Sequence, residues 1–426
     1  MKYDFDKVTD RSHTYASKTD ALPAGCPDDA LPAWVADMDL VCAEPILNAI
    51  RSRVDHGIFG YTRYDNKDCK TAVKGWYKRR FDWDIEAGHL FYSPGVVPAL
   101  GMLLQAITEP GDGIVIQKPV YYPFMMMIGN NGRRIVNNPL IRRENEEAEG
   151  VFDYTMDFED LEKKMADPSN AGMILSSPHN PVGRVWTREE LTKVIEICKK
   201  YGKWIIADEI HCDLTRCGVK HTPLLKLAGE IAPEYCERIV ACVAPSKTFN
   251  LAGLTFSNIV IPGAEFQKKW TAFVDGQFSL GHGCNPLSLA GVMAAYNEGD
   301  EWLDQLKEYL DGNIEYIGQF VKERMPKAKT AACQGTYLLW VDMNGYLNCT
   351  EGDEEARQKE VERLEYAMQK IGRVALDEGY IFGTEGGGYE RINVAMPRSL
   401  VEDCMERMAK AAEWLESGQQ PEEMNA

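Results

Sequence analysis

A unit that recurs through the middle of the chain constrains the fold most: a short apolar run, an abrupt loop, and then a helix-like stretch. The apolar runs occupy residues 114–116, 173–175, 204–207 and 239–243. Because these runs do not alternate with polar residues, they predict strands that are covered on both faces, as in a parallel sheet. Such strands alternating with helices indicate an α/β domain with a doubly wound, mostly parallel sheet.

The helix expected before the third run has the clearest boundaries. Thr187 and Glu190 form a capping-box pattern at its start, and Gly202 lies where a C-terminal stop belongs. Between these ends, apolar residues recur at the spacing of a single helix face: Leu191, Val194, Ile195 and Cys198. The pattern predicts a helix with one apolar side.

The last part of the chain has a different pattern. Long, charged helical segments cover residues 301–324 and 354–372, and strands are expected at 337–341 and 391–394. This mixture predicts a separate, smaller α+β domain.

We therefore divide the chain into three parts. Residues 1–50 form an N-terminal segment that joins the small domain, residues 51–297 form the large domain, and residues 298–426 form the small domain. At roughly 100–200 residues per domain, a chain of 426 residues has room for two or three domains.

Charge and composition exclude several classes of partner. The chain carries 47 Lys and Arg against 65 Asp and Glu, a net charge of −18, whereas nucleic acids and anionic membranes bind basic surfaces. No apolar run approaches the roughly 18 residues of a membrane-spanning helix, and the N-terminus lacks the apolar core of a secretory signal. We therefore expect neither nucleic acid nor a membrane as a partner.

The twelve cysteines are spread from Cys26 to Cys404 without any C-x-x-C pair. Neither a zinc-site pattern nor a disulfide framework fits this spacing, so we expect no metal site. Scattered free thiols are typical of a reducing compartment, and we expect the protein to be cytoplasmic.

Chemically versatile side chains follow the successive apolar runs. Tyr121 and Tyr122 come after the first run, Asn180 after the second, Asp208 directly after the third, and Lys247 after the fourth. In an open parallel sheet, ligands bind beyond the carboxyl ends of the strands. The sequence therefore predicts that these side chains meet at one edge of the sheet.

Each of these residues also has an ordinary explanation. Asp208 taken alone is a helix cap, and Asn180 begins an Asn-Pro-x-Gly sequence of the kind that forms turns. A single lysine is usually exposed, and tyrosines commonly serve packing. Their joint placement on successive strand ends favours a common site.

Pyridoxal phosphate (PLP) is a cofactor that requires such a set. A lysine forms the Schiff base, and an acid keeps the pyridine nitrogen protonated so that the ring accepts electrons. An aromatic ring stacks on the cofactor, and a polar donor reaches its phenolic oxygen. A helix N-terminus takes the phosphate, and residues 93–98 precede a helix-like stretch at 99–107.

Along nearly its whole length, the chain resembles the fold-type I PLP enzymes of the class I/II aminotransferase superfamily. The order and spacing of the matched motifs carry the resemblance, with Asp208 39 positions before Lys247. These motifs are Asn180-Pro181-x-Gly183, Asp208-Glu209-Ile210-His211, Ser246-Lys247-Thr248-Phe249 and Arg391-Ile392-Asn393-x-Ala395-x-Pro397-Arg398.

A narrower resemblance is to the MalY/PatB-type carbon–sulfur lyases, which comprise cystathionine β-lyases and cysteine-S-conjugate β-lyases. Its motifs lie at residues 34–39, 60–62, 93–97, 119–124 and 246–254, and several of them lie outside the general cofactor motifs. This resemblance implies a lyase that cleaves L-cystathionine or other cysteine S-conjugates to a thiol, pyruvate and ammonia.

The resemblance also implies roles for individual residues. Lys247 matches the Schiff-base lysine, and Asp208 matches the partner of the pyridine nitrogen. Asn180 matches the donor to the phenolic oxygen, and Tyr121 matches the aromatic residue that stacks on the ring. Arg391 matches the arginine that binds the substrate α-carboxylate, a bidentate task that suits a guanidinium.

Further matches concern the phosphate and a second subunit. Val96 and Val97 match the phosphate loop, and Ser246 is an additional phosphate contact. Tyr61 matches the tyrosine that reaches the phosphate of the neighbouring subunit's cofactor, which implies a homodimer with shared active sites.

Other positions depart from the superfamily's pattern or complete the site. His211 stands where many aminotransferases have Tyr, and we place it among the cofactor-binding residues. Ala244 and Thr255 stand where a Ser and a phosphate-binding Arg often occur. We assign Tyr122 and Ala36, together with Tyr61 and Arg391, to the substrate side.

Two other functions remain open at this point. An aminotransferase uses the same residues around the cofactor, because elimination and transamination both begin with removal of the α-proton by the freed lysine. A PLP-fold protein that acts mainly as a binding or regulatory partner is the third interpretation. The narrower motif set favours the lyase.

Overall fold

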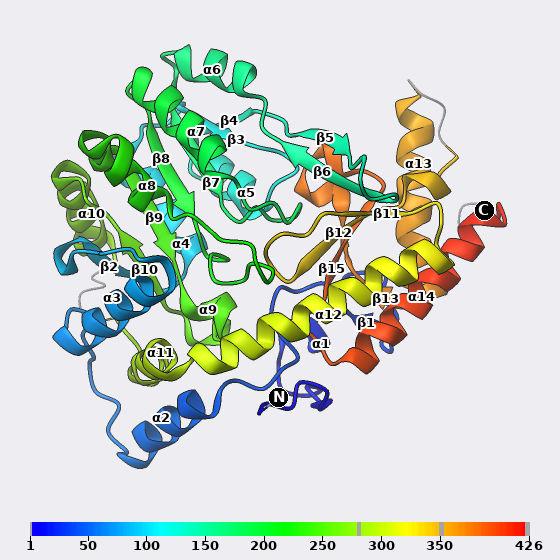
Figure 1. Cartoon of the computed structure of the whole chain (residues 1–426), viewed down its shortest axis with the longest axis horizontal. Helices are drawn as coiled ribbons and strands as arrows, with labels where there is room; N and C mark the ends of the chain where they lie inside the picture. Colours follow the sequence, from blue (N-terminus) through cyan, green and yellow to red (C-terminus); the bar gives the residue numbers. More distant parts are fainter. Residues whose placement is uncertain (1, 279–282, 349–352, 422–426) are drawn as a thin grey trace.

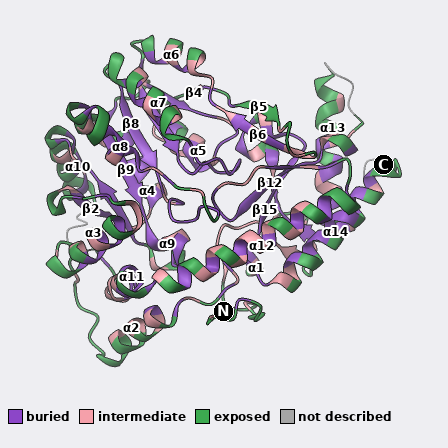
Figure 2. Cartoon of the chain, viewed as in Figure 1, coloured by how far each residue is buried: buried purple, intermediate pink, exposed green. Residues whose placement is uncertain are grey.

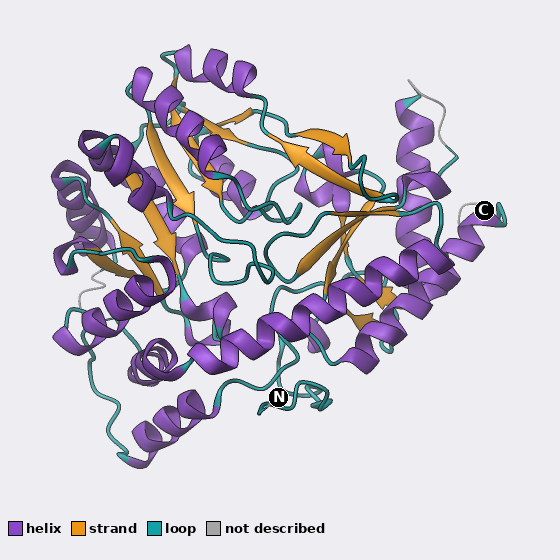
Figure 3. Cartoon of the chain, viewed as in Figure 1, coloured by secondary structure: helices purple, strands orange, loops and turns teal. Residues whose placement is uncertain are grey.

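The computed structural model describes residues 2–278, 283–348 and 353–421. Within these residues, the larger sheet has seven strands in the order β2-β10-β9-β8-β7-β3-β4, with helices on both faces (Figures 1 and 3). The strands are β2 (Leu90–Ser93), β3 (Gly113–Ile116), β4 (Arg134–Asn137), β7 (Asn170–Ser176), β8 (Trp204–Asp208), β9 (Ile239–Val243) and β10 (Ser257–Val260). All neighbours pair in parallel except β10, which is antiparallel to β2 and β9. The predicted doubly wound α/β fold is confirmed.

The apolar runs lie on the inner strands and feed two hydrophobic clusters, one on each face of the sheet. In β3, Ile114 and Ile116 belong to one cluster and Val115 to the other, because successive side chains of a strand point to opposite faces. The first cluster includes side chains of α4 and α10, and the second includes those of α7 and α8. Figure 2 shows the resulting buried centre beneath helices whose outer sides are exposed.

The helices around this sheet follow the local signals of the sequence. Thr187 and Glu190 form the predicted capping box at the start of α7, and its apolar residues 191, 194, 195 and 198 are buried. The helix predicted at 99–107 begins three residues earlier, at Val96. These helices are α3 (Lys67–Phe81), α4 (Val96–Ile107), α5 (Pro123–Asn130), α6 (Phe158–Ala166), α7 (Arg188–Lys200), α8 (Leu224–Ile231), α9 (Pro245–Thr248) and α10 (Ala264–Gln277).

A second sheet lies in the other lobe of the molecule (Figure 1). Over the described residues it has six strands in the order β14-β15-β12-β11-β6-β5. They are β5 (Ile141–Glu144), β6 (Val151–Thr155), β11 (Lys329–Ala331), β12 (Leu338–Asp342), β14 (Asp377–Glu378) and β15 (Tyr389–Asn393). The strands expected at 337–341 and 391–394 correspond to β12 and β15, whereas β5 and β6 come from the middle of the chain.

Of the helices that follow the larger sheet in sequence, the first packs against α3 of the first lobe, and the later ones cover the second lobe. The predicted helix at 301–324 is α12, which runs along both lobes (Figure 1). The pattern at 354–372 divides, because α13 ends at Tyr366 and residues 367–372 form a π-helical turn. The helices are α11 (Pro286–Glu298), α12 (Asp300–Arg324), α13 (Glu354–Tyr366) and α14 (Arg398–Glu416).

The N-terminal segment reaches across to this second lobe. After α1 (Ser17–Asp20), strand β1 (Leu31–Pro32) pairs in parallel with β13 (Val374–Ala375), and the chain then returns through α2 (Glu44–Asp55). Residues 33–40, between β1 and α2, have no helix or strand and pass between the lobes toward the strand ends of the larger sheet. Over the described residues, no helix combines the length and apolar character needed to cross a membrane.

Candidate active site

A cavity of about 180 Å³ lies at the carboxyl ends of the strands of the larger sheet. Its wall combines residues that the sequence places far apart, because parallel strands end at the same edge. The predicted site residues in this wall are Ala36, Val96, Val97, Tyr121, Asn180, Asp208, His211, Ser246 and Lys247. Residues to which the sequence motifs assigned no role also contribute to the wall, namely Ser176, Ile210, Ala252 and Phe256.

Lys247 reaches the cavity from α9, which begins two residues after β9 ends. Its Nζ donates a hydrogen bond of 2.6 Å to the carbonyl oxygen of Ala36. Burial lowers the pKa of this ammonium to about 8, and the positive charge of Arg391 acts in the same direction. Lys247 is therefore poised to lose its proton near neutral pH and to act as a nucleophile or base.

Asp208 is the last residue of β8 and is buried. Burial raises the pKa of its carboxyl to about 7, although a hydrogen bond of 3.1 Å from the Ile210 amide favours the charged form. No lysine, arginine or histidine of the described residues forms an ion pair with it within 4.0 Å. A buried carboxylate of this kind fits a protonated ring nitrogen, such as that of PLP, because the nitrogen supplies the missing cation.

His211 lies beside this pair and is held neutral. Burial lowers the pKa of its imidazole well below the usual value, and the charges of Lys247 and Arg391 add to the shift. Its ring meets the ring of Tyr337 edge-on, with 5.9 Å between centroids. Its Nδ1 has no hydrogen-bond partner among the described residues, so it is free to bond a polar group in the cavity.

The predicted phosphate loop is the start of α4. Gly95 precedes this helix in an extended conformation, and Val96 and Val97 are its first two residues. The first amide N–H groups of a helix have no partner within it and carry partial positive charge. Two such groups, with Ser246 in the same cavity wall, fit an anionic phosphate.

Arg391 lies on β15 behind the cavity, with its guanidinium buried. One nitrogen, Nη1, donates to Asn180 Oδ1 at 3.0 Å, and Nη2 donates to the carbonyl oxygen of Trp34 at 3.1 Å. Nη2 also pairs with the carboxylate of Asp377, a residue that no sequence motif had indicated. The guanidinium thus joins the second lobe to Asn180 of the first.

The position of Asp377 explains why local sequence patterns do not predict its pairing with Arg391. Asp377 and Arg391 are directly opposite each other on the antiparallel strands β14 and β15. Burial raises the pKa of Asp377, and the charge of Arg391 opposes that shift. Cross-strand pairing of these two residues depends on a register that no local pattern in the sequence reveals.

The predicted aromatic residues occupy different places. Tyr121 lines the cavity, and its backbone N–H donates to the carbonyl oxygen of Asn180 at 3.0 Å. Tyr122 packs on Tyr121 with 5.4 Å between ring centroids and lies outside the cavity wall. Tyr61 is 97% exposed and does not line the cavity of its own chain.

Comparison with known proteins agrees with this geometry. The model of the family described as aminotransferase class I and II matches residues 36–408. Cystathionine beta-lyase PatB of Bacillus subtilis (strain 168) is 41% identical over 409 residues, which cover 96% of this chain and 99% of that protein. Protein MalY of Escherichia coli (strain K12) is 32% identical, over 94% of this chain and 96% of its own.

A solved structure that contains PLP is also similar to this chain. Cystalysin from Treponema denticola, whose crystal structure contains a pyridoxal 5'-phosphate cofactor, superposes with a TM-score of 0.87 and 34% identity. The match covers 97% of this chain and all of cystalysin's. The family match over most of the chain and the close relatives lead to one conclusion: the chain belongs to the class I and II aminotransferase family.

Proposed function

We propose that this protein is a PLP-dependent carbon–sulfur β-lyase that cleaves L-cystathionine or other cysteine S-conjugates to a thiol, pyruvate and ammonia. The observation that carries the proposal is the meeting of Lys247 and Asp208 in one buried cavity, with Arg391 bonded to its wall. The 41% identity to a cystathionine beta-lyase, over nearly the whole chain, supports this substrate class.

The residues of the cavity would hold the cofactor at both ends. When bound, PLP supplies a carbonyl carbon that condenses with amines and a ring that accepts an electron pair. Asp208 would keep a proton on the ring nitrogen, and the amides of Val96 and Val97 would receive the phosphate, while Asn180 and His211 lie among the polar groups of the wall.

Two basic residues would hold and deprotonate the substrate, Arg391 next to the cavity wall and Lys247 in it. Arg391 binds the α-carboxylate through its planar guanidinium, which holds the amino acid in one orientation. Lys247, whose pKa is lowered to about 8, takes the α-proton with its neutral Nζ. Loss of that proton leaves an electron pair at the α-carbon, which would form the α–β double bond as the β-carbon–sulfur bond breaks and the sulfur leaves as thiolate. Water would then hydrolyse the released enamine to pyruvate and ammonia.

An aminotransferase is the second candidate, because the family model that matches the chain is named for that activity. Lys247, Asp208 and Arg391 would serve it equally well, so these residues do not distinguish the two reactions. The difference lies in the fate of the substrate after the α-proton has left.

One assay separates the two candidates. The holoenzyme is supplied with L-cystathionine in the absence of any keto acid, and thiol and pyruvate are measured together. Release of both in equal amounts is the expected result. Turnover that requires an added keto acid would overturn the lyase proposal in favour of transamination.

We also propose that the protein works as a homodimer with shared active sites. Tyr61, which the resemblance assigns to the neighbouring subunit's cofactor, is 97% exposed in the single chain. Ile58 and Phe59, just before it, are 66% and 56% exposed. Apolar side chains in this position suit burial against a second copy of the chain.

The division into residues 1–50, 51–297 and 298–426 stays our proposal for the domains, as does a cytoplasmic location. The parallel pairing of β1 with β13 supports joining the N-terminal segment to the small domain, whose sheet also includes β5 and β6. The cysteines of the described residues are free thiols, which supports a reducing compartment.

A further inference from the structure

The irregular segment between β1 and α2 touches both of the basic residues that the proposed reaction uses. The carbonyl oxygen of Trp34 accepts a hydrogen bond from Arg391 Nη2 at 3.1 Å. Two residues later, the carbonyl oxygen of Ala36 accepts one from Lys247 Nζ at 2.6 Å. The course of residues 34–39, which we call the carbonyl segment, therefore sets where both cationic groups are held.

Residues of both lobes hold the carbonyl segment by its backbone. Asn393 of β15 donates from Nδ2 to the carbonyl oxygens of Val35 and Asp37, at 2.6 and 2.5 Å. Asn250 accepts from the Met38 amide at 3.0 Å and donates to the Met38 carbonyl oxygen at 2.9 Å. These bonds fix the backbone of the carbonyl segment.

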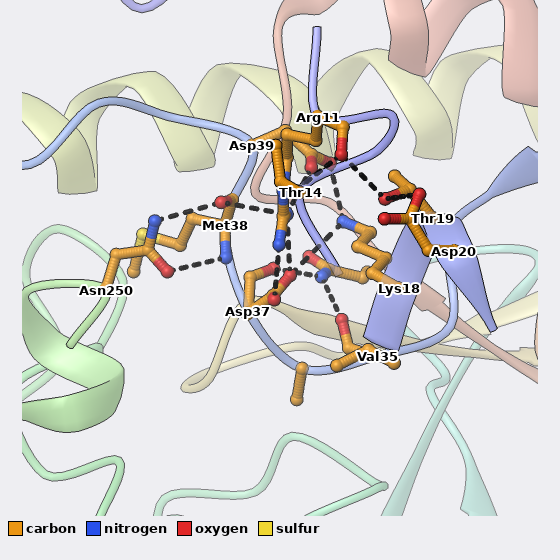
Figure 4. Close-up of polar contacts among 12 residues, drawn as sticks. Arg11, Thr14, Lys18, Thr19, Asp20, Val35, Asp37, Met38, Asp39 and Asn250 are labelled. Carbon is orange, nitrogen blue, oxygen red and sulfur yellow. Dashed lines mark hydrogen bonds and ion pairs between the residues drawn. The ribbon is translucent and has the colours of Figure 1, made fainter. Parts of the chain in front are cut away.

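A cluster of charges also holds the carbonyl segment (Figure 4). Arg11 binds both carboxylate oxygens of Asp37, at 2.7 and 2.9 Å, and reaches Asp39 at 2.6 Å. Lys18, whose side chain is fully buried, pairs with Asp39 at 2.5 Å. We call these four residues the N-terminal clamp.

The four charges of the N-terminal clamp compensate one another. Two cations face two carboxylates, and the carboxylates belong to the carbonyl segment itself. Hydrogen bonding to Asp37 raises the pKa of Arg11, so its charge is permanent. Removing one member of such a partly buried set leaves an uncompensated charge, which makes the remaining arrangement costly.

We propose that Arg11 and Lys18 are positioning residues, which fix the carbonyl segment so that Trp34 and Ala36 hold Arg391 and Lys247 in place for the amino-acid substrate. The inference rests on the proposed function for its choice of substrate. It extends that function because it gives the first 20 residues of the chain, which do not line the cavity, a part in substrate binding.

The test is a change of Arg11 read out on a ligand that has no sulfur. L-Alanine carries the amine and the α-carboxylate, and its binding to the holoenzyme changes the absorbance of the cofactor. In Arg11→Met, we expect the Kd for L-alanine to rise about tenfold and the spectral change to become slower, because a loosened carbonyl segment no longer holds Arg391 and Lys247 in position.

Two further variants sharpen the result. Arg11→Lys keeps the charge but loses the planar fork on Asp37, so it should restore part of the affinity and remain measurable if Arg11→Met fails to fold. Arg324→Met removes an exposed arginine that pairs with Glu406 at 3.1 Å, and it should bind L-alanine like the parent protein.

One outcome would overturn the proposed positioning role of Arg11 and Lys18. If both Arg11 variants bind L-alanine with the parent Kd and rate, and only their thermal midpoints fall, the clamp serves stability alone. Since L-alanine cannot release a thiol, this result is independent of the lyase assay. Failure of the parent protein to cleave L-cystathionine would overturn only the proposed function.

Discussion

Burial has opposite effects on the two central side chains of the cavity. It lowers the pKa of Lys247 to about 8 and raises that of Asp208 to about 7, because a low-dielectric environment disfavours the charged form of each. In the protein without cofactor, both groups therefore change protonation state near neutral pH. The shift of Asp208 has a cost for folding, since no basic side chain of the described residues forms an ion pair with the ionised carboxylate.

We predict that Asp208→Asn stabilises the apoprotein at alkaline pH. The folded pKa of about 7 lies above the ordinary value of 3.8, so the contribution of Asp208 to stability is fully present below pH 3.8 and is lost as the pH rises through 7. At pH 8.5 the free energy of unfolding of the variant should exceed that of the parent apoprotein, by on the order of 1–3 kcal/mol more than at pH 5.

Denaturant unfolding of both apoproteins at the two pH values provides the measurement. Asp28→Asn removes an exposed carboxylate and should show no such pH-dependent difference. The same Asp208→Asn variant should lose catalytic activity, because the ring nitrogen of the cofactor loses its anionic partner. A variant with the parent's pH dependence of stability would contradict the burial argument.

The helix α4 offers an anion the amide groups at its N-terminus and not its side chains. Val96 and Val97 are apolar, and what they offer an anion is the pair of unpaired amides at the start of the helix. The chain has no arginine at position 255, where some relatives of the superfamily carry a phosphate ligand, and Thr255 stands there instead. We therefore expect the backbone at the start of this helix to have a large part in phosphate binding.

We predict that Val96→Pro weakens PLP binding without disrupting the fold. Proline at the first position of a helix is well tolerated and lacks only the N–H group, and the extended Gly95 is compatible with a following proline. Loss of one charge-assisted hydrogen bond should raise the Kd for PLP by about tenfold to a hundredfold.

Fluorescence titration of the apoprotein with PLP gives this Kd. The matched control is Ala264→Pro, which places proline at the first position of α10, where Gly263 is also extended. Ala264 is not part of the cavity wall, so its variant should keep the parent affinity. Equal affinities for all three proteins would show that the α4 amides do not bind the phosphate.

For the whole molecule, the exposed Tyr61 leads to a prediction about two copies of the chain. Lys247→Ala removes the reacting amine, and Tyr61→Ala removes the group that we assign to the neighbouring site. Each homodimer should be inactive or strongly impaired. In a mixed dimer, one of the two sites receives a native Lys247 and a native Tyr61, so mixing should restore about a quarter of the parent activity.

The measurement is lyase activity after the two variants are dissociated and reassociated in equal amounts. The control is the same procedure applied to each variant alone. Activity no higher than the average of the two separate variants would refute sharing of Tyr61 between subunits. Light scattering of the parent protein, run in parallel, gives the oligomeric state directly.

Much of this architecture could be predicted from the sequence because its signals are local. The continuous apolar runs became β3, β7, β8 and β9, and the capping box of Thr187 and Glu190 opens α7. Parallel strands end at one edge, so residues just after the runs were expected to meet, and Asn180, Asp208 and Lys247 do line one cavity.

Contacts between distant segments were decided only by the tertiary structure. Asp377 meets Arg391 through the register of β14 and β15, and Arg11 meets Asp37 only because the N-terminal segment folds back on residues 34–39. Apolar runs, helix caps and motifs depend on residues that are close together in the chain, so they can be recognised in the sequence. The partners of a buried charge depend on which segments pack together, and that packing is a property of the whole fold.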